Sequence, residues 1–504
     1  MNLGQARMRL VHGGAVFATV ALIAGCGAGY RPVVTPVVPS GPAAQPASFA
    51  VVVSAPSPTT PGIATIVDYS GDSILALAPI GNGPVTFTID ELGENGYTVN
   101  SDGTLSNFPI STQLQAKQVE YSTLPATANP VNLFSPSSGL YAADLTGNVA
   151  DVFSGSPQAF KLSIPVSSVP VMVVGPSTVA QRQFALSQNI PGATGTECNT
   201  APTAQTTGSA DGFELSTLTV SSNLPVGVCP VYGVESSDNS RLFVLNRGDD
   251  TVTVINAANN TLDNQCPPPV GCVNQDGQTY FSHPVLPLST TAVGKTGVMP
   301  PNGQTGMPGT AGPVYAEYNP ATAQLVIADY DGGTISVIDV SEDQFGNDSQ
   351  TFGTTYTIPV GNNPASVTVL ADGSRAYTAN QTDQTVTIVT LSSHSVEKTL
   401  PITGHPRTVV STQNSLDGKV YVASPDSPVL TILRTDLDIV DTTVLTEGNI
   451  VDVRVSTQTG TAGNSNTTSR RPGYGQPCFL PPSLEPAPTG TQTALDVCRT
   501  LPTT

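Results

Sequence analysis

The chain has 504 residues and is acidic, with 37 Asp and Glu against 18 Lys and Arg and a formal net charge of −19. Nucleic acids and anionic lipid surfaces bind clustered Lys and Arg, so this charge argues against both as electrostatic partners. The 47 Gly, the 45 Pro, the low share of charged residues (11%) and the absence of Trp are typical of a turn-rich β protein.

The first 25 residues are predicted to be an export signal. Two arginines precede an apolar run at residues 15–24, which is shorter than the roughly 20 residues that span a membrane. Residues 23–26 (IAGC) resemble the lipobox of bacterial lipoproteins, and this resemblance implies that Cys26 is diacylated and becomes the new N-terminus. Gly27 then favours the outer membrane, on its periplasmic side or at the cell surface. An ordinary secretory signal peptide or a single transmembrane anchor is the alternative.

Three further regions follow the export signal. Residues 26–50 carry a Pro every few residues and almost no charge, which predicts an extended tether. Residues 51–456 are the predicted folded body, and residues 457–504 a loose, irregular tail.

The cysteines predict disulfides. Without Cys26, an even number remains, and an exported protein with an even number of cysteines is expected to pair them. A zinc site is the alternative, although no CxxC pair and no nearby His supports it. The six cysteines form three neighbouring pairs, which we expect to be Cys198 with Cys229, Cys266 with Cys272, and Cys478 with Cys498.

A β-hairpin pattern recurs six times between residues 63 and 434. Its clearest copies are RLFVLNRGDDTVTVIN (241–256), QLVIADYDGGTISVID (324–339) and RAYTANQTDQTVTIVT (375–390). An alternating strand ends in a polar residue, and a second alternating strand begins five residues later. The polar closing residues are Asp68, Asp144, Asn246, Asp329, Asn380 and Ser424.

Short joints rich in Gly and Pro, such as TIPVGNNP (357–364), separate these hairpins at a period of about 40 residues. With a further strand on each side of every hairpin, each period has four antiparallel strands, which is one propeller blade. Tandem immunoglobulin-like sandwiches need roughly 100 residues per unit, so the period is too short for them. Seven joints predict an all-β fold, a seven-bladed β-propeller with long loop insertions at residues 81–117, 189–216 and 259–310.

We expect the ring to close by strand exchange. Residues 449–456 have the pattern of a first strand whose blade does not continue, and residues 63–78 that of a blade without its first strand. Joining the two would protect both edges.

The repeats resemble a known family. The segments RAYTANQTDQTVTIVTL, RLFVLNRGDDTVTVINA and IPVGNNPASVTV are similar to the YVTN-type β-propeller repeats of bacterial surface and periplasmic proteins. The similarity is good over residues 226–456, fair over 63–166 and poor over 175–225. It implies a fold and no particular chemistry.

Two sets of residues are candidates for a site. In propellers the joints and the turns after the second strands share one face, so Asp68, Asp144, Asn246, Asp329 and Asn380 are expected there. They either cap turns or bind a cation or a sugar, and Ca²⁺ would need six to eight oxygens. His405 and Arg407, in one joint, are either solvated or act as base and anion clamp in a lactone or ester hydrolase.

The predicted function is that of an envelope-anchored lipoprotein that binds or scaffolds, without catalysis. No cofactor is expected apart from possible Ca²⁺, and the identity of a metal is open. The expected partners are the membrane, through the lipid, and an envelope protein or polysaccharide. A lactonase-like propeller hydrolase in the periplasm and a cell-surface adhesion or matrix protein are the alternatives.

Overall fold

A computed structural model describes residues 48–136, 139–175, 182–192, 198, 206–288, 311–412 and 418–457. The chain divides into two compact units, Met1–Pro46 and Ala47–Thr504, and every described residue belongs to the second. The export signal, Cys26, most of the predicted tether and the tail with Cys478 and Cys498 lie outside the described residues. Within the described ranges, no helix is both long and apolar enough to cross a membrane.

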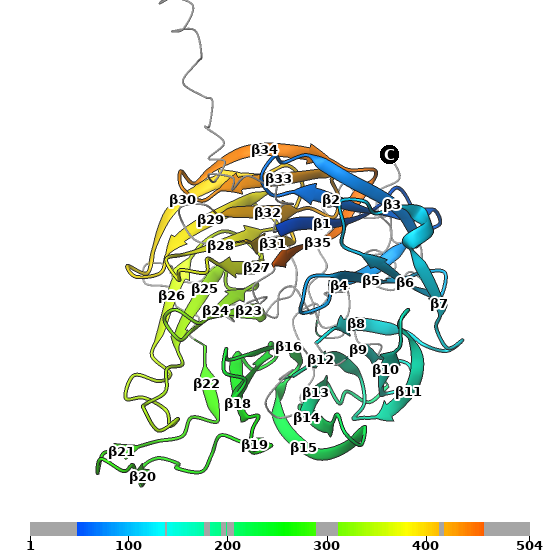
Figure 1. Ribbon diagram of the computed structural model, residues 1–504. Coiled ribbons are helices and arrows are strands. Elements are labelled where there is room, and N and C mark those ends of the chain that lie inside the picture. The colour runs from blue at the N-terminus through cyan, green and yellow to red at the C-terminus, as the bar shows by residue number, and fades with distance from the viewer. Residues whose placement is uncertain are drawn as a thin grey trace, which may run out of the picture. The chain divides into compact units, whose positions relative to one another are not determined.

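The described residues form eight blades of antiparallel strands (Figure 1). From the innermost to the outermost strand, the first four blades are β35 (Asn449–Thr457), β1 (Ser48–Ala55), β2 (Pro61–Asp68), β3 (Ile74–Asn82); β4 (Pro84–Ile89), β5 (Asn95–Asn100), β6 (Thr104–Pro109), β7 (Glu120–Thr123); β8 (Pro130–Phe134), β9 (Leu140–Asp144), β10 (Val149–Ser154), β11 (Ala159–Pro165); and β12 (Pro170–Val174), β13 (Arg182–Ser187), β14 (Thr207–Glu214), β15 (Thr219–Val228).

The last four blades, in the same order of strands, are β16 (Pro230–Glu235), β17 (Arg241–Asn246), β18 (Thr251–Asn256), β19 (Thr261–Leu262); β23 (Pro313–Asn319), β24 (Gln324–Asp329), β25 (Thr334–Asp339), β26 (Thr355–Pro359); β27 (Pro364–Val369), β28 (Arg375–Asn380), β29 (Thr385–Thr390), β30 (Ser395–Pro401); and β31 (Thr408–Ser411), β32 (Lys419–Ala423), β33 (Val429–Arg434), β34 (Ile439–Leu445). In the fifth blade β22 (Val285–Pro287) also pairs with β18, and β20 (Cys272–Val273) pairs with β21 (Thr279–Tyr280) in a separate small hairpin. A single turn of 3₁₀ helix, η1 (Ala116–Gln118), precedes β7.

The innermost strands contact one another in a closed ring, in the order β35, β4, β8, β12, β16, β23, β27, β31 and back to β35. The fold is therefore an all-β propeller of eight blades, and the predicted count of seven is wrong. The missed blade is β4–β7, most of which had been predicted to be a loop insertion at residues 81–117. Its second strand closes at Asn100 and its third begins at Thr104, one residue sooner than in the six hairpins that set the pattern.

The other two predicted insertions are part strand and part loop. The range 189–216 includes β14, and 259–310 includes β19 to β22. The six-hairpin pattern had matched only the pairs of strands with a polar closing residue and a fixed spacing, so strands with other spacing were counted as loops.

The ring closes by the predicted exchange of a C-terminal strand. β35 pairs antiparallel with β1, from Ser48 opposite Thr457 to Ala55 opposite Asn449. Figure 1 shows β1, at the blue end of the colour scale, beside β35, at the orange-red end. β1 separates β35 from β2, so the blade takes three strands from the N-terminal part of the chain. β1 starts at Ser48, which lies inside the range predicted to be the tether.

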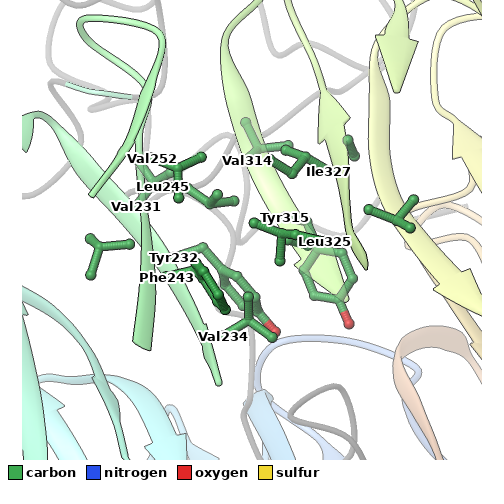
Figure 2. Close-up of a cluster of buried hydrophobic side chains, with 14 of the residues drawn as sticks. Val231, Tyr232, Val234, Phe243, Leu245, Val252, Val314, Tyr315, Leu325 and Ile327 are labelled. Atoms are coloured by element: carbon green, nitrogen blue, oxygen red, sulfur yellow. The ribbon is translucent and has the colours of Figure 1, made fainter. Parts of the chain in front are cut away.

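The core lies between neighbouring blades, because both faces of each sheet are covered. In Figure 2 the side chains of β16 and β17 face those of β23 and β24. Tyr232 and Tyr315, both fully buried, bring their ring centroids within 4.6 Å at a tilt of 47°. Such a pair stabilises the fold by about 0.5–1.5 kcal/mol beyond the contribution of the surface area that it buries. The sequence of a strand with both faces buried is a nearly continuous run of apolar residues, as in RLFVLN of β17.

At the inner edges of the blades, some backbone N–H groups donate hydrogen bonds to side chains of the preceding blade. Each innermost strand has backbone N–H groups that no further strand accepts, and buried N–H groups need a partner. Asn132 Oδ1, Glu317 Oε2 and Ser366 Oγ accept these bonds from Val173 N (2.8 Å), Val369 N (2.8 Å) and Val409 N (3.2 Å). These contacts link the innermost strands of consecutive blades around the ring.

Candidate functional site

Asp68, Asp144, Asn246, Asp329 and Asn380, which were predicted to share one face, are called the ring residues below. Two of them, Asn246 and Asn380, are fully buried and hydrogen-bonded inside their own blades. Each closes the second strand of its blade, and its side-chain amide donates to two threonine hydroxyls of the third strand. The bonds run from Asn246 Nδ2 to Thr251 Oγ1 (3.0 Å) and Thr253 Oγ1 (2.9 Å), and from Asn380 Nδ2 to Thr385 Oγ1 (3.0 Å) and Thr387 Oγ1 (2.8 Å). The amides therefore tie the hairpin together.

Asp329 has the same place in the sixth blade. Its Oδ2 accepts bonds from Thr334 Oγ1 (3.0 Å) and Ser336 Oγ (2.7 Å). Burial, together with charge repulsion from Asp250 and Asp331, raises the pKa of Asp329 to about 7, against the lowering effect of the two hydroxyls. The side chain is a carboxyl group that is half protonated near neutral pH.

Asp144 acts as a turn cap. Its Oδ1 accepts from the backbone N–H of Thr146 (3.0 Å) and Gly147 (3.3 Å), and its Oδ2 accepts from Asn129 N (3.1 Å) in the joint. This is the capping role that Asp has in turns.

Asp68 is not on the same face as the other four. Asp144, Asn246, Asp329 and Asn380 each pair with the proline that begins the innermost strand of the blade. Asp68 instead pairs with Phe49, which pairs with Ser456 near the end of β35. The hairpin at residues 63–78 consists of the third and fourth strands of its blade, and the other hairpins consist of the second and third. One strand of offset reverses the face.

The ring residues are thus separate hairpin contacts and do not converge. In the part of the chain that the structure describes, no group of three or more His, Cys, Asp or Glu side chains could hold a metal ion.

The joints repeat because their glycines meet the closing residues. A Cβ on Gly361 would lie 2.7 Å from Asn380 Cγ, and one on Gly227 would lie 2.6 Å from Asn246 Cγ. Real Cβ atoms do not approach so closely, so a larger residue would displace the amide. The pattern of Gly three residues before Pro is therefore a packing requirement of the Asn that closes the hairpin.

A second repeated contact involves an Asp in the turn after the second strand, which had not been predicted as a site residue. In four blades this Asp accepts a hydrogen bond from a backbone N–H of the joint. The pairs are Asp102 with Asn82 (2.9 Å), Asp249 with Val228 (3.0 Å), Asp383 with Asn362 (2.8 Å) and Asp426 with His405 (2.8 Å). Its position two or three residues after the closing residue is the signal that could have revealed it.

His405 is oriented by this repeated carboxylate. His405 Nδ1 lies 2.6 Å from Asp426 Oδ2, and the Gln384 amide nitrogen lies 3.0 Å from His405 Nε2. With the proton on Nδ1, the ring donates to Asp426 and accepts from Gln384. Burial alone would raise the pKa of Asp426, but the hydrogen bonds from His405 outweigh it and lower that pKa. The Nε2 lone pair that a general base would use is engaged.

Arg407 is almost fully buried, and its Nη2 donates to the backbone carbonyl of Val451 in β35. This bond links the joint of the eighth blade to the closing strand. His405 and Arg407 are therefore neither solvated, as one prediction had it, nor directed together at one point.

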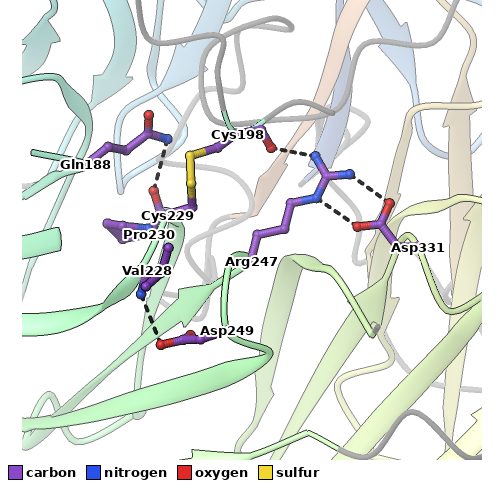
Figure 3. The surroundings of a disulfide bond; sticks show 8 residues. All are labelled: Gln188, Cys198, Val228, Cys229, Pro230, Arg247, Asp249 and Asp331. Carbon is purple, nitrogen blue, oxygen red and sulfur yellow. Dashed lines mark hydrogen bonds and ion pairs between the residues drawn. A yellow bond between two sulfur atoms is a disulfide. The ribbon is translucent and has the colours of Figure 1, made fainter. Parts of the chain in front are cut away.

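The Cys198–Cys229 disulfide lies beside a buried arginine that sequence reasoning missed (Figure 3). Arg247 forms a two-point ion pair with Asp331, with distances of 3.1 Å for Nε–Oδ2 and 2.8 Å for Nη2–Oδ1. Its Nη1 donates to the carbonyl of Cys198 (2.7 Å), and its guanidinium lies 5.5 Å from the centre of the Tyr330 ring. One side chain thus ties the disulfide loop to the fifth and sixth blades.

The structure contains two of the three expected disulfides, Cys198–Cys229 and Cys266–Cys272, with Cα–Cα distances of 5.8 and 5.2 Å. The third expected pair, Cys478 and Cys498, lies outside the described residues.

Comparisons with known proteins support the fold. No protein-family model matches the chain, and no curated protein matches it. Among solved structures, AztD from Citrobacter koseri is similar, with a TM-score of 0.53 and 11% identity over 81% of this chain and 97% of that chain. The dihydro-heme d1 dehydrogenase NirN has a TM-score of 0.52 and 13% identity over 86% of this chain and 80% of that chain. At such identities the likeness shows a propeller fold alone.

Proposed function

We propose that the chain is an exported, lipid-anchored propeller of the YVTN type that binds or scaffolds a partner in the bacterial cell envelope. The observation that carries this proposal is the use of the repeated polar residues. Asn246, Asp329, Asn380 and the turn aspartates are engaged within and between blades, which supports a rigid body that presents its loops and outer edges. The two disulfides support export, because such bonds persist in oxidising compartments.

Lipid attachment is tested by metabolic labelling. The full chain is produced in a bacterial host that is fed an alkyne fatty acid, beside a Cys26→Ser variant. Label on the wild-type chain and none on the variant supports the anchor. An unlabelled wild-type chain that is released into the periplasm would overturn it in favour of an ordinary signal peptide.

The side of the membrane is tested by protease treatment of intact cells. Protection of the chain until the outer membrane is opened indicates a periplasmic scaffold. Cleavage in intact cells indicates surface exposure, and the adhesion or matrix role then becomes the better proposal.

A lactonase-like hydrolase is the second candidate, favoured by the contact between His405 and Asp426. The assay compares turnover of lactones and esters by the wild-type chain, His405→Gln and His405→Ala. Turnover that both substitutions abolish would establish the hydrolase. We expect no difference among the three, because Asp426 serves the joint backbone as the equivalent aspartates do in three other blades.

A further inference from the structure

The outermost strand of the fifth blade is interrupted by residues 263–284, which we call the inserted segment. β19 pairs with Ile255 and Asn256 of β18, and β22 resumes the same ladder at Thr253. At Val254, between the two, the backbone bonds to both ends of the inserted segment. The segment itself leaves the blade and carries the small hairpin of β20 and β21, which extends away from the ring in Figure 1.

Both ends of the inserted segment are held at one buried arginine. Arg241 of β17 forms an ion pair with Asp263, where the segment begins. Arg241 Nη1 also lies 2.8 Å from Asp348 Oδ1, and Asp348 Oδ2 lies 2.7 Å from Nδ1 of His283, next to the end of the segment. Glu342 pairs with Arg241 Nε. We call these five residues the Arg241 cluster.

The Arg241 cluster joins the inserted segment to the sixth blade. Glu342 and Asp348 belong to the loop that follows β25. Further hydrogen bonds run between the same loop and the segment, from Gln350 Nε2 to the carbonyl of Thr279 (3.0 Å) and from Asn274 Nδ2 to Asp343 Oδ2 (3.2 Å). The segment is therefore held against the sixth blade by the cluster and by this loop.

The charges of the Arg241 cluster do not balance. One guanidinium faces three carboxylates, and Asp263 and Asp348 both approach the same Nη1. With all three ionised and His283 neutral, negative charge is in excess. Arg241, Asp263 and Asp348 are all buried, so water screens this repulsion weakly. Loss of a proton from the cluster therefore weakens it.

The surroundings of the cluster add no further Lys or Arg from the two segments that form it. Residues 259–288 and 341–354 contain neither residue type. Further titratable side chains beside the cluster are Asp238, Asp343 and Tyr318. Burial, together with the charges of Asp238 and Glu342, raises the pKa of Tyr318, against a hydrogen bond with Ser237. These neighbours increase the excess of negative charge.

Asp348 takes up the excess charge as a proton. Burial, together with charge repulsion from Asp263, raises the pKa of Asp348 to about 6, against the lowering effects of Arg241 and His283. An unburied Asp titrates near 3.8. The stabilisation from this proton is thus complete below pH ~4 and is lost as pH rises through about 6. His283 carries positive charge only when protonated, so its proton loss acts in the same direction.

We propose that the Arg241 cluster is a pH-dependent latch, which holds the inserted segment against the sixth blade in mildly acidic surroundings and releases it more often as pH rises. The proposal goes beyond the binding role proposed above and does not depend on it. The far end of the segment bears an apolar surface, where Val270 is 83% and Val273 66% exposed. The latch would decide whether this surface is fixed to the propeller.

Amide hydrogen exchange of the full chain at pH 5 and pH 8 tests the latch. Mass spectrometry follows peptides from residues 263–284, and each rate is divided by the intrinsic exchange rate at that pH. A shift of the Asp348 pKa from 3.8 to about 6 predicts that the opening constant of the segment rises about tenfold between the two pH values. An unchanged opening constant in the wild-type chain would overturn the proposal.

Two matched variants assign the effect. Asp348→Asn keeps the shape of the side chain and removes its titration, so the change should shrink to less than about threefold. Asp276→Asn makes the same substitution at an exposed carboxylate of the same segment, which bonds to Gln344, and should keep the tenfold change. A tenfold change that persists in Asp348→Asn, or that Asp276→Asn also abolishes, would refute the latch.

Discussion

At the scale of single residues, three equivalent positions in consecutive blades differ in one atom. Asn246 and Asn380 donate their amide hydrogens to two hydroxyls, and Asp329 accepts from the same two positions. A buried amide carries no charge, but a buried carboxylate must lose its hydration. The pKa of Asp329 rises to about 7 for that reason.

Asp329→Asn should remove part of the pH dependence of stability. The folded state holds this proton more tightly than the unfolded chain, whose Asp titrates near 3.8. The stabilisation is therefore complete below pH ~4 and is lost as pH rises through about 7. One pKa unit is worth about 1.4 kcal/mol, so the loss is at most on the order of 4 kcal/mol. Urea unfolding at pH 5 and pH 8 measures the part of this loss above pH 5, which is about 3 kcal/mol.

The matched variant is Asn380→Asp, which places a carboxyl group at the same position of the next blade. It should introduce a loss of stability between pH 5 and pH 8 that the wild-type chain lacks at this site. An unchanged pH dependence in Asp329→Asn would mean that the Asp329 carboxyl group is not the one that titrates.

At the scale of elements, the joint and the hairpin form one packing unit. The glycine of the joint lies against the closing asparagine, and the aspartate of the turn binds the joint backbone. In the seventh blade the three residues are Gly361, Asn380 and Asp383. A change at one of them is felt by the others, so their energies should not add.

Gly361→Ala should destabilise the protein by about 1–3 kcal/mol, because the new methyl group overlaps the Asn380 side chain. In an Asn380→Gly background, which removes the Cβ as well as the amide, the same change should cost much less. Chemical denaturation of the four chains of this double-mutant cycle gives both values. Equal costs in the two backgrounds would contradict the contact.

Arg247→Met should cost about 3–5 kcal/mol, because it leaves the buried carboxylate of Asp331 without its partner. Arg434→Met, which removes an ion pair with Asp436 near the surface, is the control and should cost about 0–1 kcal/mol. Thermal unfolding of both variants, with the disulfides intact, measures the difference. Similar small losses in both would show that Asp331 is reached by water.

At the scale of the whole molecule, the ring depends on one strand. β35 contributes Ile450, Val453 and Val455 to the core between the eighth and first blades. It also covers the inner edge of β1 along its whole length. An open sheet edge invites pairing with other chains.

A chain that ends at Gly448 should therefore fail to give a folded monomer, whereas one that ends at Thr457 should keep the cooperative unfolding of the full chain. Size-exclusion chromatography and amide hydrogen exchange of β1 compare the two. A stable monomer without residues 449–457 would refute the role of β35 as the closing strand.

Local patterns in the sequence determined the hairpins, the joints, both described disulfides and the exchange of β35. Alternation of apolar and polar residues shows which face of a strand is buried. Cysteines that are neighbours in the sequence have few other cysteines to pair with. Only the tertiary structure decided the number of blades, because Asn100 and Thr104 break the spacing that identified six of the other seven. It also decided the face on which Asp68 lies, because Asp68 ends the third strand of its blade and not the second.

The candidate site divides in the same way. The polar residues that close the repeated strands could be found from the sequence, but their buried hydrogen bonds depend on neighbouring strands. His405 and Asp426 meet across a joint and a turn, and the carboxylates of the Arg241 cluster come from two blades. The contact of the His405 side chain with Asp426 and the Arg241 cluster each occur once among the described residues, so no repeated pattern in the sequence marks them, and only the folded ring could reveal them.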